Sequence, residues 1–289
     1  MRIRAVRFDI TVVTLGWMNP FLLMLLMLTL TIPAPSHAAV FFDTSFETCA
    51  VGTGNDFPCE GWDDFNGEAV GHLQITNSLA FSGTKSVKGT FDNINGSTRT
   101  PTIARSWTRV PHIFARFAHR ASSGFQLGSN GQTKLVRFKD DVGYPLVWIY
   151  NRYGTYSVIM EGPYDYAGTY VLSSGIAPSQ TSWDQIEFEW KLNTPGQSNG
   201  LMRLWINGTL RAEQLNKAYI GPTSTSIGAS GLPNPSGYRI RTAQIYIQSG
   251  LGSLYYDRFA VGDTRIGLAT SQPSGDTTPP ITPAGVQVQ

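Results

Sequence analysis

The feature of this sequence that most constrains its fold is a strict alternation of apolar and polar residues. It is clearest between residues 182 and 210, which read SWDQIEFEWKLNTPGQSNGLMRLWINGTL. In the first run the apolar positions are Ile186, Phe188, Trp190 and Leu192, and the polar positions between them are Gln185, Glu187, Glu189 and Lys191. A period of two predicts β-strands with one buried and one polar face. Asn207-Gly208 at the end of the second run predicts a tight hairpin, because both residues tolerate positive φ.

The same alternation recurs along most of the chain, and no long segment has the spacing of an amphipathic helix. Nearly every apolar run ends at Gly, Pro, Asn or Ser, as strands do. The runs expected to form strands span residues 40–47, 84–91, 112–121, 133–140, 145–152, 155–161, 183–192, 201–208, 239–248 and 253–263. About ten to fourteen antiparallel strands in a chain of this size predict an all-β fold, a two-sheet sandwich or jelly roll.

The two ends of the chain differ from this pattern. Residues 1–38 combine three early arginines, an apolar run at 21–32 and the small-x-small sequence Ser36-His37-Ala38, which predicts a cleaved secretory signal peptide. An uncleaved anchor is the alternative, although the apolar run is shorter than the roughly 20 residues of a membrane span. We therefore expect a secreted, periplasmic or cell-surface protein with no membrane association after cleavage. Residues 39–269 should form the β-sandwich domain, and residues 270–289, rich in Pro, Thr, Ser and Gly, a flexible tail or linker.

Charge and cysteine content narrow the function further. The net charge is only +2, and three positive charges lie in the leader, so the remaining chain is near neutral. This argues against a nucleic-acid partner while leaving room for a local basic cleft. Cys49 and Cys59 are close in sequence, and in an exported protein they predict a disulfide that closes a short loop. A thiol nucleophile or a metal-binding pair is the alternative.

Several segments resemble the concanavalin A-like lectin/glucanase superfamily, in particular its polysaccharide lyase-like jelly-roll branch of alginate, glucuronan and heparin lyases. These segments are FFDTSFE, AFSGTKSVKG, the hairpin quoted above and SLYYDRFAVGDTRIG, and the resemblance spans about residues 40–267. The Gln-Ile-His triplet of alginate lyases is absent; the nearest run is QIYIQ, with Tyr246 where the histidine would lie. The tail resembles the lead-in to a fibronectin type III module of bacterial secreted proteins.

The resemblance also implies a structural calcium ion between the first and last strands, away from the cleft. The residues that match its ligands are Glu47 and Asp257, with Asp43 and Asp263 as weaker candidates. Carboxylates are suitable ligands, because calcium prefers hard oxygen donors. The alternative is a pair of ordinary carboxylates at strand ends. We expect no other cofactor.

A polysaccharide-binding face needs flat aromatic rings and fork-like polar groups. The candidate substrate-binding residues from the strands are Arg116, Arg137, Trp148, Tyr150, Gln185, Glu187, Glu189, Arg203, Trp205 and Gln244. A row of this kind can form one wall of a glycan cleft. It can equally be a solvent-facing sheet surface held by cross-strand charge pairs.

A lyase must neutralise a uronate carboxylate, remove the proton at C5 and protonate the leaving oxygen. His119 is the candidate general base, because its neighbours Arg116 and Arg120 should lower its pKa and keep it neutral. Lys134 resembles a cleft lysine of related lyase-like sequences, and Tyr246 or Tyr150 is the candidate partner. An ordinary hydrogen-bonded histidine at a strand end is the alternative for His119.

The sequence thus predicts a secreted β-sandwich protein that binds an acidic polysaccharide, with two hypotheses for the fate of the bound polymer. The first is cleavage by β-elimination. The second is binding alone, by a non-catalytic, lectin-like or surface module. A glycoside hydrolase is a weaker third, because EFEWKL lacks the Glu-x-Asp-x-x-Glu pattern of the laminarinase-like enzymes.

Overall fold

The computed structural model describes residues 39–52, 56–64, 72–93, 101–139, 146–161, 170–194, 196–219, 239–246 and 248–270. The predicted signal peptide and nearly all of the predicted tail lie outside these ranges. The described residues include no helix, and hence none long and apolar enough to cross a membrane.

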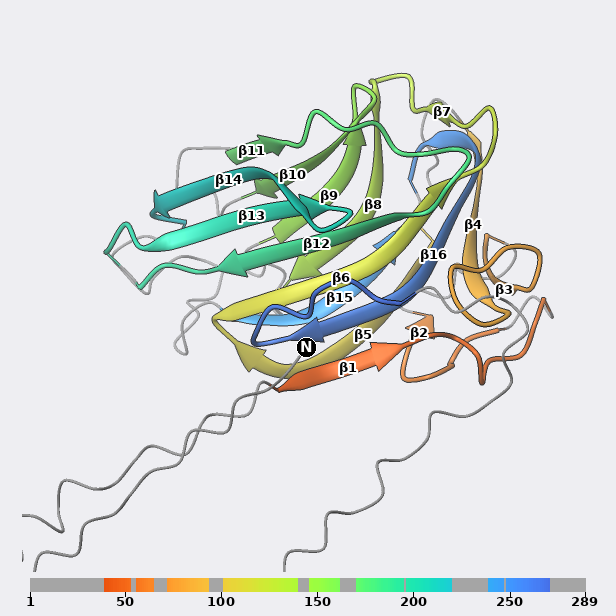
Figure 1. The fold of residues 1–289 in the computed structure, drawn as a ribbon, viewed down its shortest axis with the longest axis horizontal. Coiled ribbons are helices and arrows are strands. Elements are labelled where there is room, and N and C mark those ends of the chain that lie inside the picture. The colour runs from red at the N-terminus through yellow and green to blue at the C-terminus, as the bar shows by residue number, and fades with distance from the viewer. Residues whose placement is uncertain are drawn as a thin grey trace, which may run out of the picture. The chain divides into compact units, whose positions relative to one another are not determined.

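The described residues form two antiparallel sheets stacked in two layers (Figure 1). The nine-stranded sheet has the order β14 (Thr209–Lys217), β13 (Gly200–Ile206), β12 (Asp184–Lys191), β6 (His112–Ala121), β16 (Gly250–Gly262), β4 (Ser86–Asn93) and β3 (Leu73–Thr76). Its remaining strands, β1 (Val40–Thr44) and β7 (Gln126–Leu127), both pair with β16.

The seven-stranded sheet forms the second layer. Its order is β11 (Tyr170–Ser173), β10 (Thr155–Glu161), β9 (Leu146–Arg152), β8 (Gln132–Lys139), β15 (Ile240–Tyr246), β5 (Thr102–Val110) and β2 (Asp63–Asp64). The sixteen strands of the described ranges exceed the expected number, because the expected runs do not include β2, β3, β5, β7, β11 and β14. The all-β, two-sheet prediction is confirmed.

The core lies between the sheets and is built from the apolar half of each alternating strand. Ile186, Phe188 and Trp190 of β12 are fully buried, as the period of two predicts. The Phe188 ring stacks on Phe138 of β8 in the other sheet, with ring centroids 5.8 Å apart. Each such side chain contributes roughly 1.5–3 kcal/mol by leaving water. The polar residues of each strand are therefore left on the outer face of its sheet.

Two local predictions are also confirmed. Asn207 and Gly208 have φ values of 52° and 78°, and they turn β13 directly into β14. Cys49 and Cys59 are joined in a disulfide, with their Cα atoms 5.6 Å apart. Closing a loop of this length should stabilise the fold by roughly 2–3 kcal/mol.

Candidate functional site

The outer face of the seven-stranded sheet carries a cluster of basic, aromatic and amide side chains. Strand β8 lies between β15 and β9, so that Arg137 is paired with Gln244 on one side and with Trp148 on the other. Lys134 is paired with Tyr150 in the same way. We call the cluster on this face the basic face; it consists of Lys134, Arg137, Trp148, Tyr150, Gln244 and Tyr246.

Cation–π contacts hold the basic face together. Lys134 Nζ lies 4.1 Å from the centre of the Trp148 ring and 5.6 Å from that of Tyr246. The Arg137 guanidinium carbon lies 4.8 Å and 5.0 Å from the same two ring centres. Arg137 Nε also donates a hydrogen bond to Gln244 Oε1. Each contact of this kind contributes roughly 0.5–2 kcal/mol and fixes the position of the cation.

Burial divides this cluster into a floor and a surface. Trp148 and Tyr150 are each 3% exposed and Tyr246 is 8% exposed, whereas Lys134 and Arg137 are half-buried. The expectation that Trp148 and Tyr150 stack on sugar rings therefore needs correction, because stacking requires an open ring face. Their rings instead support the two cations, which are the groups that remain partly open to solvent.

The side chains described for this sheet carry an excess of positive charge. Its central strands carry Lys134, Arg137, Lys139 and Arg241. Among the side chains described for the sheet, the only carboxylates are those of Asp63 and Asp64 on the edge strand β2. An excess of positive charge on one face raises the local concentration of anionic ligands.

The structure does not bring His119 into this cluster. His119 lies on β6 of the other sheet, is fully buried, and has its Nδ1 2.8 Å from the Tyr156 hydroxyl. That hydroxyl donates to Asp184 Oδ2 at 3.0 Å, which gives a buried chain of polar groups. Burial lowers the pKa of His119 to about 3, rather than the arginine neighbours invoked from the sequence. A histidine enclosed in this way cannot reach the C5 proton of a polysaccharide.

Three polar side chains of β12, Gln185, Glu187 and Glu189, lie on the outer face of the nine-stranded sheet. We call them the glutamate row; residues 264–270 cover it at Gln185 and Glu187. We call residues 264–270 the C-terminal strap; they follow β16 and turn back over the sheet (Figure 1). Glu187 accepts hydrogen bonds from Arg265 Nε and from Gly267 N, both at 2.8 Å. Gln185 Oε1 accepts one from Ala269 N at 2.6 Å.

The other candidates on this face are held by the chain in the same way. Arg116 donates to Asp43 at 3.1 Å and to the carbonyl of Gly267 at 3.4 Å. Trp205 is 7% exposed, and the Arg265 guanidinium lies 4.6 Å from the centre of its ring. The sequence left two interpretations of this row, a cleft or a solvent-facing surface. The structure gives a third, because the row fastens the C-terminal strap.

Glu189 and Arg203 belong to a charge network on the same sheet. Glu189 accepts hydrogen bonds from His112 Nε2 at 2.9 Å and from Arg203 at 3.1 Å. Arg203 also contacts Glu213 at 3.2 Å. Burial acts to raise the pKa of Glu189, but the bonds from His112 and Arg203 outweigh it and hold the pKa below its usual value. The substrate-binding roles expected for Arg116, Gln185, Glu187, Glu189, Arg203 and Trp205 therefore need correction, because other groups of the chain already contact each of these side chains.

Glu47 and Asp257 lie near each other but are surrounded by donors. Glu47 accepts hydrogen bonds from the backbone N–H groups of Thr84 and Lys85, and Asp257 accepts them from Phe81, Ser82 and Arg258. The Lys85 ammonium donates to the carbonyls of Glu47 and Cys49 at 2.7 and 2.6 Å.

This arrangement does not fit a calcium ion, which needs six to eight oxygen ligands turned toward it. The described ranges also contain no group of three His, Cys, Asp or Glu side chains that could hold a metal ion. The Lys85 ammonium supplies the positive charge in this region. Calcium at Glu47 and Asp257 stays a prediction drawn from the resemblance.

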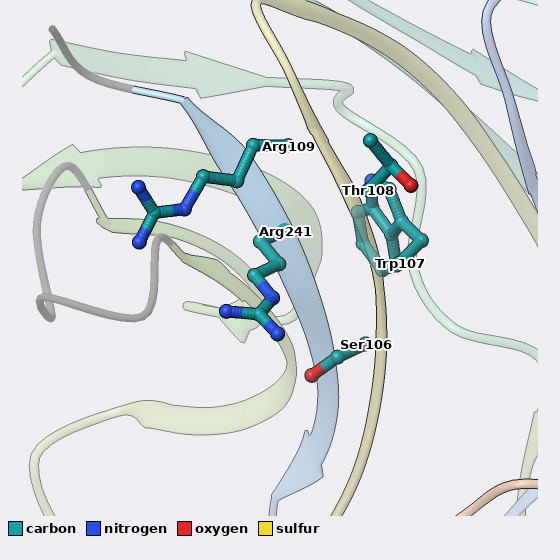
Figure 2. A pocket seen from close by; sticks show the side chains of 5 residues that line it. All are labelled: Ser106, Trp107, Thr108, Arg109 and Arg241. Carbon is teal, nitrogen blue, oxygen red and sulfur yellow. The ribbon is translucent and has the colours of Figure 1, made fainter. Parts of the chain in front are cut away.

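A pocket of about 500 Å³ lies beside β5 and β15 (Figure 2). It is lined by Ser106, Trp107, Thr108, Arg109 and Arg241. None of these residues was predicted to belong to a site, because β5 has no clean alternation. The signal that could have found them is the recurrence of arginine in the segments SWTRV and RIRT.

These observations define the protein as a two-sheet jelly-roll β-sandwich with a basic outer face on one sheet. Comparison with solved structures agrees on the fold. The PL-14 alginate lyase from Aplysia kurodai superposes with a TM-score of 0.56 and 9% identity, over 78% of this chain and 99% of that chain. A double mutant of alginate lyase Aly36B, in complex with alginate trisaccharide, gives 0.54 and 12%, over 78% and 98%.

The endo-β-1,4-glucuronan lyase from the fungus Trichoderma reesei gives a TM-score of 0.49 and 17% identity, over 70% of this chain and 94% of that chain. No protein-family model matches the sequence, and no curated protein matches it. The resemblance to the lyase-like jelly-roll branch is thus confirmed for the fold.

Proposed function

We propose that this protein is exported and that it binds an acidic polysaccharide on the basic face and cleaves it by β-elimination. The observation that carries the proposal is the convergence of Arg137, Gln244, Lys134 and Tyr246 on one sheet face. The Cys49–Cys59 disulfide supports export, because disulfides persist in oxidising compartments. The two alginate lyases that share the fold support a polysaccharide as the ligand.

Each part of the reaction has a suitable group on this face. The Arg137 guanidinium can bind the uronate carboxylate, and the buried Gln244 holds Arg137 in place through their hydrogen bond. Binding the carboxylate makes the C5 proton more acidic by stabilising the charge that develops there. Lys134 and Tyr246 are the candidate groups for the two proton transfers. One of them takes the proton from C5, the C4–O bond breaks as the C4=C5 double bond forms, and the other gives a proton to the leaving oxygen.

A specific observation favours the second hypothesis, a binding module without catalysis. Tyr246 is 8% exposed and Gln244 is fully buried, so these two groups are screened from bulk solvent. A module that only binds needs the two half-buried cations and no proton transfer. Binding and cleavage must therefore be measured separately.

The test is absorbance near 235 nm while the protein is mixed with alginate, glucuronan, pectate and glycosaminoglycans, since elimination creates an absorbing unsaturated uronate. We expect a rise with at least one polymer and its loss in Lys134→Ala. The matched control is Lys88→Ala, which removes a lysine from β4 of the other sheet. Retained binding with no rise for any polymer would make the protein a binding module. Absence of both would overturn the proposal.

A further inference from the structure

We propose that Arg109 and Arg241, with the Ser106 hydroxyl, form a second anion-binding subsite that holds another acidic group of the same polysaccharide. This inference rests on the function proposed above and extends it. It makes the preferred ligand a polymer with acidic groups on many of its residues, rather than one with a single charge at the cleavage point.

The pocket has the composition of an anion site. Figure 2 shows the side chains of Arg109, Arg241 and Ser106 on the same side of the strands, with both guanidinium groups directed into the hollow. Ser106, Thr108 and Arg109 are exposed, and Arg241 is half-buried. Guanidinium groups match the planar oxygens of a carboxylate or sulfate, and hydroxyl groups add further donors.

The pairing of β5 with β15 brings the two arginines close together, next to a bulge. Ile240 is paired with Val110 and Thr242 with Ser106, so that Arg241 alone lies opposite residues 107–109 of β5. Extra residues on one strand break the alternation and change the direction of the side chains. Because Ile240 is paired with Val110, Arg241 and Arg109 are the next residues along the two strands, and cross-strand neighbours of an antiparallel pair lie on one face.

Trp107, which also lines the pocket, packs its ring against β1 and holds this part of β5 in place. Its ring stacks on Phe41, with centroids 6.3 Å apart and an interplanar angle of 12°, and it lies 5.9 Å from the ring of Phe42. Both phenylalanines belong to β1. Because the tryptophan is anchored against a neighbouring strand, the arginines project from a backbone that is held in place.

The pocket continues the basic face along β15. The Ser106 and Thr242 hydroxyls are 3.0 Å apart, Thr242 is paired with Lys139, and the next pair on the same face is Gln244 with Arg137. Arg241 precedes Gln244 by three residues, or about 10 Å along a strand at 3.3 Å per residue. An oligosaccharide that places one carboxylate on Arg137 can therefore reach the arginine pair with a later acidic group.

The experiment compares Arg109→Gln/Arg241→Gln with a control of equal charge change on the other sheet, Lys88→Gln/Arg211→Gln. Binding is measured by affinity electrophoresis in alginate and glucuronan, and in a sulfated galactan that lacks carboxylates. We expect the pocket variant to bind the preferred polyuronate about tenfold more weakly and to depend less on salt, while the control keeps wild-type affinity. Cleavage of oligosaccharides too short to span the two positions should be unchanged.

The outcomes separate the subsite from the proposed reaction. Weaker binding by the pocket variant without any cleavage by the wild type would keep the subsite and retire the lyase. Equal binding by the wild type and the pocket variant would overturn the subsite even if cleavage were observed. Loss of binding to the sulfated galactan alone would assign the pocket to sulfate and overturn its role for uronates. A wild type that binds none of the polymers would overturn both proposals.

Discussion

His119 shows how burial controls what a single residue can do in this protein. Its ring is enclosed between the sheets and lies 2.8 Å from the Tyr156 hydroxyl. A charged imidazole loses its hydration there, and this lowers the pKa of His119 to about 3. The residue that the sequence favours for catalysis therefore acts on stability instead.

We predict that His119 makes the fold sensitive to acid. The folded-state pKa is depressed, so the stabilising contribution is complete above the unfolded value of about 6.5 and is lost as the pH falls toward 3. Between pH 6.5 and pH 5 the loss should be about 2 kcal/mol at 1.36 kcal/mol per pH unit. Urea unfolding at both pH values measures it.

His119→Asn is the matched variant, because its amide can replace Nδ1 beside Tyr156 without titrating. It should lose about 2 kcal/mol less than the wild type over this pH interval. An equal loss in both proteins would show that His119 does not determine the acid sensitivity.

Lys85 provides a second prediction at the residue scale. Its ammonium binds the carbonyls of Glu47 and Cys49, so Lys85→Met should cost about 1–3 kcal/mol by leaving them without a donor. Lys88→Met on β4, the strand that follows Lys85, is the control and should cost less. Thermal unfolding should be unaffected by calcium or by EDTA in the wild type. A rise of several degrees with calcium would contradict this arrangement and support the ion expected at Glu47 and Asp257.

At the scale of elements, the C-terminal strap covers part of the outer face of the nine-stranded sheet and so keeps a ligand from this part. It covers the polar side of β12 and β13 through bonds to Gln185 and Glu187. Glu187 is 1% exposed beneath it, so its charge depends on these partners for stabilisation. The strap thus covers polar side chains of β12 that would otherwise be exposed to solvent and could form a binding surface.

We predict that cutting this attachment destabilises the protein without changing ligand binding. Arg265→Ala leaves the buried Glu187 carboxylate with one partner fewer and should lower the free energy of unfolding by about 1–3 kcal/mol. Arg211→Ala on β14 is the matched control and should have little effect. Loss of polysaccharide binding in Arg265→Ala, with stability unchanged, would instead place the ligand on this face.

The elements also show what the sequence could predict. Strict alternation located β6, β10 and β12 almost residue by residue, because one buried face per strand produces a period of two. β5 was missed because its bulge interrupts that period, and β14 because an edge strand with little burial has few apolar residues. The alternation in β12 predicts which of its side chains lie on the buried face and which on the polar face. It does not predict which part of the chain covers the polar face. The strap over Glu187 could not be predicted for that reason.

At the scale of the whole molecule, the outer faces of the two sheets differ in which side chains remain available to bind a ligand. The face of the nine-stranded sheet is occupied by the chain itself at Gln185, Glu187 and Trp205. The face of the seven-stranded sheet holds the positive charge, with Lys134 and Arg137 half-buried on an aromatic floor. A chain that is near neutral overall can therefore still bind an acidic polymer, because few of its described carboxylates lie on the seven-stranded sheet.

The candidate site was only partly accessible to sequence reasoning. Lys134, Arg137, Gln244 and Tyr246 were singled out as polar positions on strands, and the fold places them together. His119 could not be excluded in advance, because its burial depends on the position of β6 against the opposite sheet. The assignment of the aromatic residues as stacking platforms failed for the same reason, since the depth of Trp148 depends on the cations packed over it.

The central claim is that the basic face cleaves an acidic polysaccharide, and its most direct test is the absorbance change near 235 nm with uronate polymers. We predict a rise with the wild type and with Lys88→Ala, and a loss of at least about tenfold in rate for Lys134→Ala and Arg137→Ala, since each removes a proton-transfer or carboxylate-binding group. His119→Asn should retain the activity at neutral pH. A flat trace with every polymer, or an activity that survives in Lys134→Ala and Arg137→Ala but disappears in His119→Asn, would contradict the account.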